Sequence, residues 1–278
     1  HSTQWLRQQV KDVSDEDLAN FFDWQVHVLP FAYKLFVQPT IPNYDHQEYF
    51  GLDGEYTEEI NSIHDQVQEF WAHSGVDDDI RVLCAHGSDL ADRHEKLIPT
   101  LEVLYGGSYG DDYTLFDHST DIQELITRLP GGYNFPLLTF NAFATDEIYE
   151  NGYPSIIIGD GYFEFQRSMG LASEGPEYAL THEHAHHLQF TMGLTREDYG
   201  TSQAARRQEL MADAFSAYFL GHNRGGDMMA DEIDAIHRTA YAVGDCEISN
   251  DGHHGTPHQR SKCCSSIILF LDEKVTSF

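Results

Sequence analysis

The sequence predicts an α+β fold in which a small mixed sheet is combined with long helices. Two apolar runs, at residues 136–144 and 155–159, have the length and the branched side chains of buried strands. Two later segments, at residues 176–192 and 202–221, have helical spacing, and a glycine stands at or just after the end of each. We therefore expect the second half of the chain to hold a sheet and two neighbouring helices.

Before these segments the pattern is mainly helical. Ser14 begins a helix that leads into an apolar stretch ending near residue 36. Further elements are expected as helices at 57–73, 88–105 and 120–129, with a kink or a break at Pro99, and as a strand at 80–84. After a helix at 231–243, the tail reads as loop with one strand-like run at 265–271.

Charge excludes two classes of partner. The chain has 278 residues, with 16 basic and 46 acidic side chains and a net charge of −30. Nucleic acids and anionic membranes select basic surfaces, so neither is expected as a partner. No apolar run approaches the roughly 18 residues that a membrane span requires. Such an acidic chain fits a secreted protein that works at acid pH or a protein from a salty environment.

The four cysteines predict disulfides. Cys84, Cys246, Cys263 and Cys264 show no C-x-x-C spacing, which argues against a zinc site made of cysteines. The adjacent Cys263 and Cys264 favour pairing outward, one with Cys246 and the other with Cys84. Disulfides are typical of secreted proteins. The chain starts at His1 without an initiator Met, so we interpret it as a processed or trimmed form.

The segment from His182 to His186 contains the first candidate metal ligands. These two histidines are four residues apart in a predicted helix, so both imidazoles lie on one face, one turn apart, where they can share a metal ion. Glu183 follows the first histidine, and its carboxylate can reach a metal-bound water without ligating the metal. This is the H-E-x-x-H pattern, which predicts a zinc site.

Two common positions for a third ligand are ruled out. In the extended pattern H-E-x-x-H-x-x-G-x-x-H, Gln189 occupies the glycine position and Met192 the last histidine position. A version with an aspartate ligand after Gly-Thr also fails, because Ala204 stands where the aspartate is needed.

A glutamate on the following helix fits instead. Glu209 lies 23 residues beyond His186, and Asp213 follows it by four residues on the same helical face. Asp213 can accept a hydrogen bond from the outer nitrogen of a ligand histidine, most simply His182, and so fix its tautomer. The sequence thus predicts that zinc is bound by His182, His186 and Glu209.

Several blocks occur in one order along the chain: residues 155–160, 182–189, 209–213, 242–245 and 254–260. Together they resemble a family of neutral zinc metallopeptidases, a branch of the zincins with a glutamate as third ligand. The resemblance implies a zincin-like fold, one Zn²⁺ on the ligands named above, and Glu183 as general base. His184 departs from the family, which carries a small or apolar residue there, and the N-terminal half carries no resemblance.

A mechanism follows from these residues. Zinc with three protein ligands keeps a fourth position for water and lowers the pKa of that water to about 7. Glu183 takes the proton and passes it to the leaving amine. His254, at the centre of the closing block, is the candidate donor to the oxyanion. His258, Tyr178 and Tyr241 are weaker candidates. The strand at 155–159, taken as an edge strand, is expected to pair with an extended peptide.

We therefore expect a secreted, monomeric zinc metallopeptidase that acts on peptide or protein substrates. Its N-terminal region, residues 1–134, would pack on a catalytic core formed by residues 135–278. Two alternatives remain: a zinc hydrolase of a non-peptide amide or ester, and a non-catalytic zinc-binding protein. The pair His184 and His187 could hold a second metal, but we interpret both as exposed or core histidines. We interpret the acidic clusters at 77–79 and 111–112 as solvated loops rather than calcium sites.

Overall fold

The computed structural model describes residues 2–42, 47–74, 80–91, 93–106, 113–146, 153–194, 202–245 and 254–275. Over these residues the protein is α+β and mostly helical, with one three-stranded sheet. None of the helices in these ranges is long and apolar enough to cross a membrane.

The chain forms two compact units that interleave along the sequence. Unit 1 comprises His1–Glu55, Leu83–Ala142 and Ile157–Phe165, and unit 2 comprises Tyr56–Val82, Phe143–Ile156 and Gln166–Phe278. Neither unit coincides with residues 1–134 or 135–278. A boundary placed by composition is a single point on the chain, whereas these units are each assembled from three separate segments.

The sheet has the order β1-β3-β2, with strands β1 (Arg81–Ala85), β2 (Ala142–Thr145) and β3 (Ser155–Gly159). The Arg81 amide donates to the Pro154 carbonyl, and the Gly159 amide donates to the Asn141 carbonyl. These bonds join the start of β1 to the start of β3, and the end of β3 to the start of β2. The sheet is therefore mixed, as predicted, with β1 parallel and β2 antiparallel to β3.

The prediction that residues 155–159 form an edge strand is wrong. β3 is the central strand, and all five of its residues are buried. Both of its backbone edges are paired within the sheet, so it has no free edge to offer a peptide. The apolar run at 136–144 also differs from the prediction. Pro136–Leu138 forms a 3₁₀ turn, with the proline in its first position, and only the end of the run enters β2.

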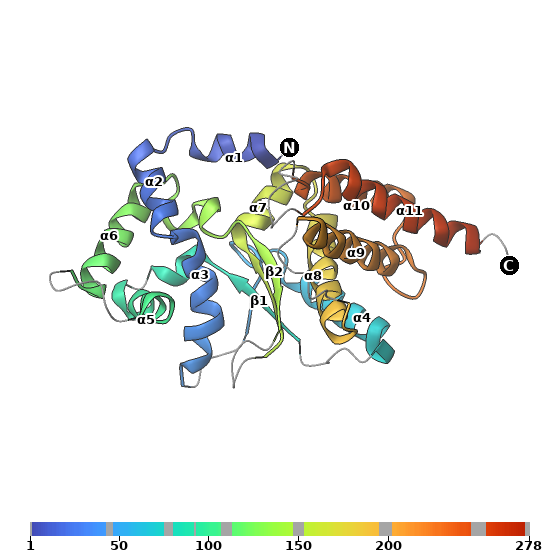
Figure 1. Cartoon of the computed structure of the whole chain (residues 1–278), viewed down its shortest axis with the longest axis horizontal. Coiled ribbons are helices and arrows are strands. Elements are labelled where there is room, and N and C mark those ends of the chain that lie inside the picture. Colours follow the sequence, from blue (N-terminus) through green and yellow to red (C-terminus); the bar gives the residue numbers. More distant parts are fainter. Residues whose placement is uncertain are drawn as a thin grey trace. The chain divides into compact units, whose positions relative to one another are not determined.

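Unit 1 holds the helices α1 (Ser2–Val10), α2 (Asp15–Asp23), α3 (Leu29–Ala32), α5 (Arg93–Tyr105) and α6 (Leu115–Arg128), which are labelled in Figure 1. Ser14 caps α2 as predicted, because its side chain accepts from the Asp17 amide. Pro99 lies inside α5 without ending it. The core of the unit is formed by fully buried side chains such as Phe21, Leu97, Ile122 and Leu125.

Unit 2 holds the helices α4 (Thr57–Trp71), α8 (Glu174–Thr191), α9 (Ser202–Gly221), α10 (Ala230–Val243) and α11 (Pro257–Val275). A further helix, α7 (Asp160–Ser168), directly follows β3. α8 packs against α4 and α9, and α11 packs against α9 and α10 (Figure 1). The bounds of α9 match the predicted 202–221. α8 ends just before Gly193, whose φ of 63° suits the stop predicted there.

The strand-like run at 265–271 is part of a helix, α11, so that prediction is wrong. Hydrogen bonds and a proline fix the residue at which α11 begins. The Thr256 amide donates to Gln259 Oε1, and the Gln259 amide donates to Thr256 Oγ1, which is a capping box. Pro257 occupies the first helical position, where its missing N–H costs nothing. Cys264 and Ile268, four residues apart, are both buried, as a helix packed on one face requires.

The predicted disulfides are wrong for the cysteines that the structure describes. Cys84, Cys263 and Cys264 are free. Cys84 lies on β1 in unit 1, whereas the other two lie on α11 in unit 2. The Cys263 thiol donates to the Leu210 carbonyl at 3.1 Å. Residue 246 and the acidic clusters at 77–79 and 111–112 lie outside the described residues.

Candidate metal centre

Three predicted ligands meet between α8 and α9. His182 Nε2 lies 3.2 Å from Glu209 Oε2, and His186 Nε2 lies 3.5 Å from Glu209 Oε1. The two imidazole rings are nearly perpendicular, at 89°, with centroids 4.9 Å apart. In a tetrahedral zinc site with bonds of about 2.0–2.2 Å, ligand atoms lie about 3.3 Å apart. The three side chains therefore have the spacing of a shared zinc ion.

Small residues and two polar bridges hold α8 against α9. Ala185 and Ala212 are buried in one cluster with Leu188, so little side-chain bulk separates the two helices. On one side of the ligands, Thr181 Oγ1 lies 2.6 Å from Ser216 Oγ. On the other side, Gln189 Nε2 donates to the Gln208 carbonyl at 2.8 Å. These bridges pair the early part of α8 with the late part of α9, so the helices are antiparallel and their i,i+4 pairs face each other.

Asp213 contacts His182, the histidine that the sequence analysis paired with it. Its Oδ1 lies 2.9 Å from His182 Nδ1, and its side chain is fully buried. A hydrogen bond at Nδ1 leaves Nε2, the nitrogen that faces Glu209, to bind a metal ion. The Tyr178 hydroxyl also donates to Asp213 Oδ1, so this weaker oxyanion candidate is engaged away from the ligand atoms.

Arg260 also contacts the predicted site residues, and the sequence did not reveal it. It projects from α11, is 2% exposed, and donates to Asp213 through Nε at 2.9 Å and through one terminal nitrogen at 2.7 Å. The other terminal nitrogen lies 3.7 Å from Glu209 Oε2. Such a two-point contact with a carboxylate is the strong geometry for arginine. The one available signal was that Arg260 closes the last of the resembling blocks.

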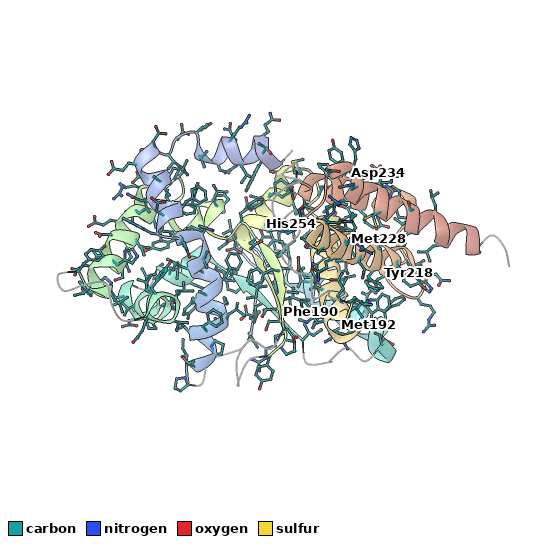
Figure 2. The ribbon with its side chains drawn as sticks, in the orientation of Figure 1. Phe190, Met192, Tyr218, Met228, Asp234 and His254 are labelled. Atoms are coloured by element: carbon teal, nitrogen blue, oxygen red, sulfur yellow. The ribbon has the colours of Figure 1, made fainter. Side chains whose placement is uncertain are left out.

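His254, labelled in Figure 2, lies in the segment just before α11. Its Nδ1 lies 3.0 Å from Glu209 Oε2, while its side chain remains 57% exposed. The backbone amide of His254 donates to the Asp245 carboxylate at 2.8 Å. The ring is thus held beside the ligand atoms and remains open to solvent. His258 and Tyr241, the remaining weaker candidates, pack against each other, with ring centroids 5.4 Å apart.

The protonation of the site suits a cation. Burial would lower the pKa of His182, but hydrogen bonds to Asp213 and Glu209 raise it to about 9. Burial would raise the pKa of Glu209, but hydrogen bonds with His182 and His254 hold it well below its usual range. Burial would also raise the pKa of Asp213, but the charge of Arg260 and the hydrogen bond to His182 lower it to about 2. Both carboxylates are therefore ionised, and a metal ion would displace the proton on His182.

Glu183, the predicted general base, directly follows His182 on α8 and is 7% exposed. The carboxylates of Glu209 and Asp213 both contact His182, and Arg260 pairs with Asp213. The structure therefore brings together the three predicted ligands and Asp213, and it adds Arg260 to them.

His184 and His187 lie beside the site but do not extend it. Both histidines are buried rather than exposed. Neither ring nitrogen of His184 has a hydrogen-bond partner among the described residues. Burial, with the charges of His187 and His64, lowers the pKa of His184 to about 3. His187 Nε2 lies 3.2 Å from the Ser155 carbonyl oxygen. Within the described residues, neither histidine belongs to a group of three or more potential ligands.

Comparison of the chain with family models, with curated proteins and with solved structures gave no match. The resemblance to neutral zinc metallopeptidases therefore rests on the motif residues alone.

Proposed function

We propose that the protein is a secreted, monomeric zinc metallopeptidase with a zincin-like fold. One observation carries the proposal. His182 and His186 on α8 meet Glu209 on α9 at distances that suit one zinc ion, and Asp213 holds His182. A glutamate after the first of two facing histidines is typical of catalytic rather than structural zinc sites. The net charge of −30 argues against nucleic acid and anionic membrane as partners, whereas the secreted location loses the support that disulfides among the described cysteines would have given it.

Each residue then has a defined task. When bound, zinc supplies a polarised water with a lowered pKa. Glu183 accepts the proton of that water and delivers it to the leaving amine. His254 donates a hydrogen bond to the developing oxyanion of the substrate. Asp213 fixes the tautomer of His182, and Arg260 holds Asp213 in place.

The choice of peptide substrates is supported by the resembling motif, not by the sheet. Because β3 is the central strand, substrate cannot pair with it. The loss of that expected peptide-binding edge favours one rival, a zinc hydrolase of a non-peptide amide or ester. The same water and the same base would serve that reaction.

A single substitution tests the proposal. We expect the zinc-loaded wild type to cleave casein or a mixed-peptide library. Glu183→Gln should keep its zinc and lose on the order of 10²–10⁴-fold in kcat, because the general base is gone. Glu174→Gln makes the same chemical change at the start of α8 and serves as the matched control, with wild-type activity expected.

Three outcomes would contradict the proposal in different ways. A Glu183→Gln protein that retains zinc and cleaves at the wild-type rate would exclude Glu183 as the base. A wild type that leaves peptides intact but hydrolyses other amides or esters would establish the rival. Zinc-loaded wild type that hydrolyses neither class would identify a non-catalytic zinc-binding protein.

A further inference from the structure

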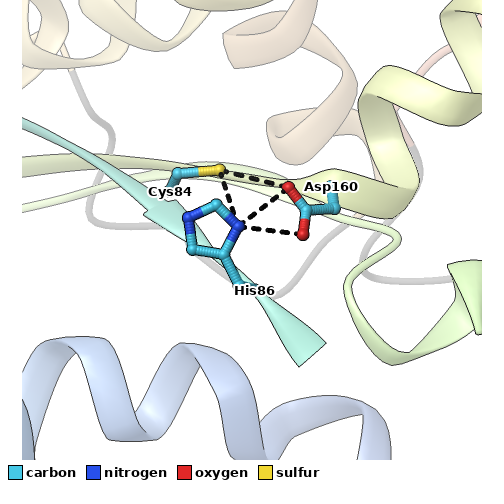
Figure 3. Close-up of side chains that lie close together, drawn as sticks. All are labelled: Cys84, His86 and Asp160. Atoms are coloured by element: carbon cyan, nitrogen blue, oxygen red, sulfur yellow. Dashed lines mark hydrogen bonds and ion pairs between the residues drawn. The ribbon is translucent and has the colours of Figure 1, made fainter. Parts of the chain in front are cut away.

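A second group of potential metal ligands lies in unit 1, which contains none of the residues of the α8–α9 site. It consists of Cys84, His86 and Asp160, shown in Figure 3. Their side chains are almost completely enclosed, with exposed fractions of 0%, 1% and 4%. The proposed peptidase mechanism uses none of them.

The sheet builds this group from two neighbouring parallel strands. Cys84 lies near the end of β1, His86 follows that strand directly, and Asp160 follows β3 as the first residue of α7. The carboxyl ends of adjacent parallel strands meet at one edge of a sheet, which is a common place for binding sites. The next residue, Gly161, holds Asp160 in position. The backbone of Gly161 packs against the backbone of Pro136, and the Gly161 amide donates to Thr139 Oγ1 at 2.9 Å.

The distances suit a shared ion. Cys84 Sγ lies 3.9 Å from His86 Nδ1 and 3.6 Å from Asp160 Oδ1, and His86 Nδ1 lies 3.0 Å from Asp160 Oδ1 (Figure 3). A tetrahedral zinc ion with a bond of about 2.3 Å to sulfur and about 2.0 Å to nitrogen or oxygen separates sulfur from nitrogen by about 3.5 Å, and nitrogen from oxygen by about 3.3 Å. The group could close on such an ion with shifts of a few tenths of an ångström.

The three side chains converge on one another. The Cys84 thiol donates to Asp160 Oδ1, and His86 Nδ1 lies 3.0 Å and 2.9 Å from the two Asp160 oxygens. His86 Nε2 has no hydrogen-bond partner among the described residues, so Nδ1 is the ring nitrogen that faces the other two ligands. A divalent cation bound here would be neutralised by the Cys84 thiolate and the Asp160 carboxylate.

The surroundings hold these ligands in place. The Tyr49 ring stacks on the His86 ring, with centroids 4.0 Å apart and planes 12° from parallel. The Cys84 amide donates to Glu48 Oε2 at 3.2 Å, and Lys34 lies 3.0 Å from the same oxygen. Lys34 therefore offsets the charge of Glu48, which would otherwise add to that of the thiolate and Asp160.

We propose that Cys84, His86 and Asp160 bind a second zinc ion. One sulfur, one nitrogen and one oxygen ligand suit Zn²⁺ better than Mg²⁺ or Ca²⁺, which require oxygen. The ion ties the end of β1 to the start of α7 and keeps a fourth coordination position.

Cobalt substitution distinguishes this site from the other. Co²⁺ bound to a thiolate gives a sulfur-to-metal charge-transfer band in the near ultraviolet. The α8–α9 site offers only nitrogen and oxygen ligands. We expect the full-length metal-free protein to develop this band when saturated with Co²⁺. Cys84→Ser should abolish the band, whereas Cys263→Ser, which changes a half-buried cysteine on α11, should leave it intact.

Zinc stoichiometry provides the second readout. The wild type should bind two zinc ions, and Asp160→Asn and His182→Gln should each bind one. His182→Gln should keep the cobalt–thiolate band, so a failure of the α8–α9 site cannot be mistaken for a failure of this one. Absence of the band in saturated wild type would overturn the proposal whether or not any variant folds. So would a band that survives in folded Cys84→Ser.

Discussion

Asp213 offers the sharpest test of how the α8–α9 site is held together. Asp213→Asn keeps the size of the side chain but removes its charge and replaces one acceptor oxygen with an NH₂ group. In the native site both carboxylate oxygens accept, from Arg260, His182 and Tyr178, and the residue is fully buried. The amide would remove the closest carboxylate from Arg260, leaving Glu209 at 3.7 Å, and its NH₂ group would face another donor.

The size of the effect follows from burial. Arg260 is 2% exposed and Asp213 is 0% exposed, so the broken pair has almost no access to water. Removing one partner of a buried ion pair costs about 3–5 kcal/mol of folding free energy. Losing the carboxylate that orients a ligand histidine lowers metal affinity about 10–100-fold, which is about 1.4–2.7 kcal/mol of binding free energy.

Two assays separate these effects. Urea unfolding in the presence of a chelator measures the folding term alone, and competition against a chromophoric chelator measures zinc affinity. Asp234→Asn is the matched control, because Asp234 pairs with Arg238 on the surface of α10, where the side chains are 71% and 55% exposed. That variant should change the free energy of unfolding by less than about 0.5 kcal/mol. If Asp213→Asn matched this control in both assays, the reasoning about the buried pair would be refuted.

Three further predictions concern other parts of the chain. Burial, with the charges of Glu177 and Glu174, raises the pKa of Glu59 from 4.5 to about 7. The folded state therefore favours protonated Glu59. The contribution of this group to the free energy of unfolding is complete below pH 4.5, the pKa in the unfolded chain, and is lost as the pH rises through about 7. Urea unfolding should show Glu59→Gln gaining stability over wild type at pH 8 but not at pH 4, and an equal difference at both would contradict this. Mass spectrometry after thiol labelling of the denatured, unreduced chain should find all three described cysteines labelled, and any of them in a disulfide would be a contrary result. Thr114→Ala should lose about 1 kcal/mol of stability in the same unfolding assay, because it removes the capping box of α6, and an unchanged midpoint would count against that role.

Helical periodicity explains why part of the site could be predicted. Two residues four apart on a helix share a face whatever the rest of the fold does, so the pairs on α8 and α9 could be read directly from spacing. Arg260 could not, because its contact with Asp213 spans 47 residues and depends on how α11 packs. A lone arginine in a sequence gives no sign that it will be buried against a carboxylate.

Strands and cysteines show the same limit. The residues at 155–159 have strand composition, yet only hydrogen bonding to both neighbours makes β3 central. The run at 265–271 is apolar and short, so it suits a strand as well as a helix. In the structure it continues the helix that begins at the capping box of Thr256 and Gln259. The group around Cys84 was invisible in the sequence, because it exists only where β1 lies beside β3.

The central claim is that one zinc ion is bound between α8 and α9. Anomalous diffraction at the zinc edge, from crystals grown with zinc, would locate that ion directly. The account predicts a peak within bonding distance, about 2.0–2.2 Å, of His182 Nε2, His186 Nε2 and a Glu209 oxygen. A fully zinc-loaded crystal without a peak between these three side chains would contradict it.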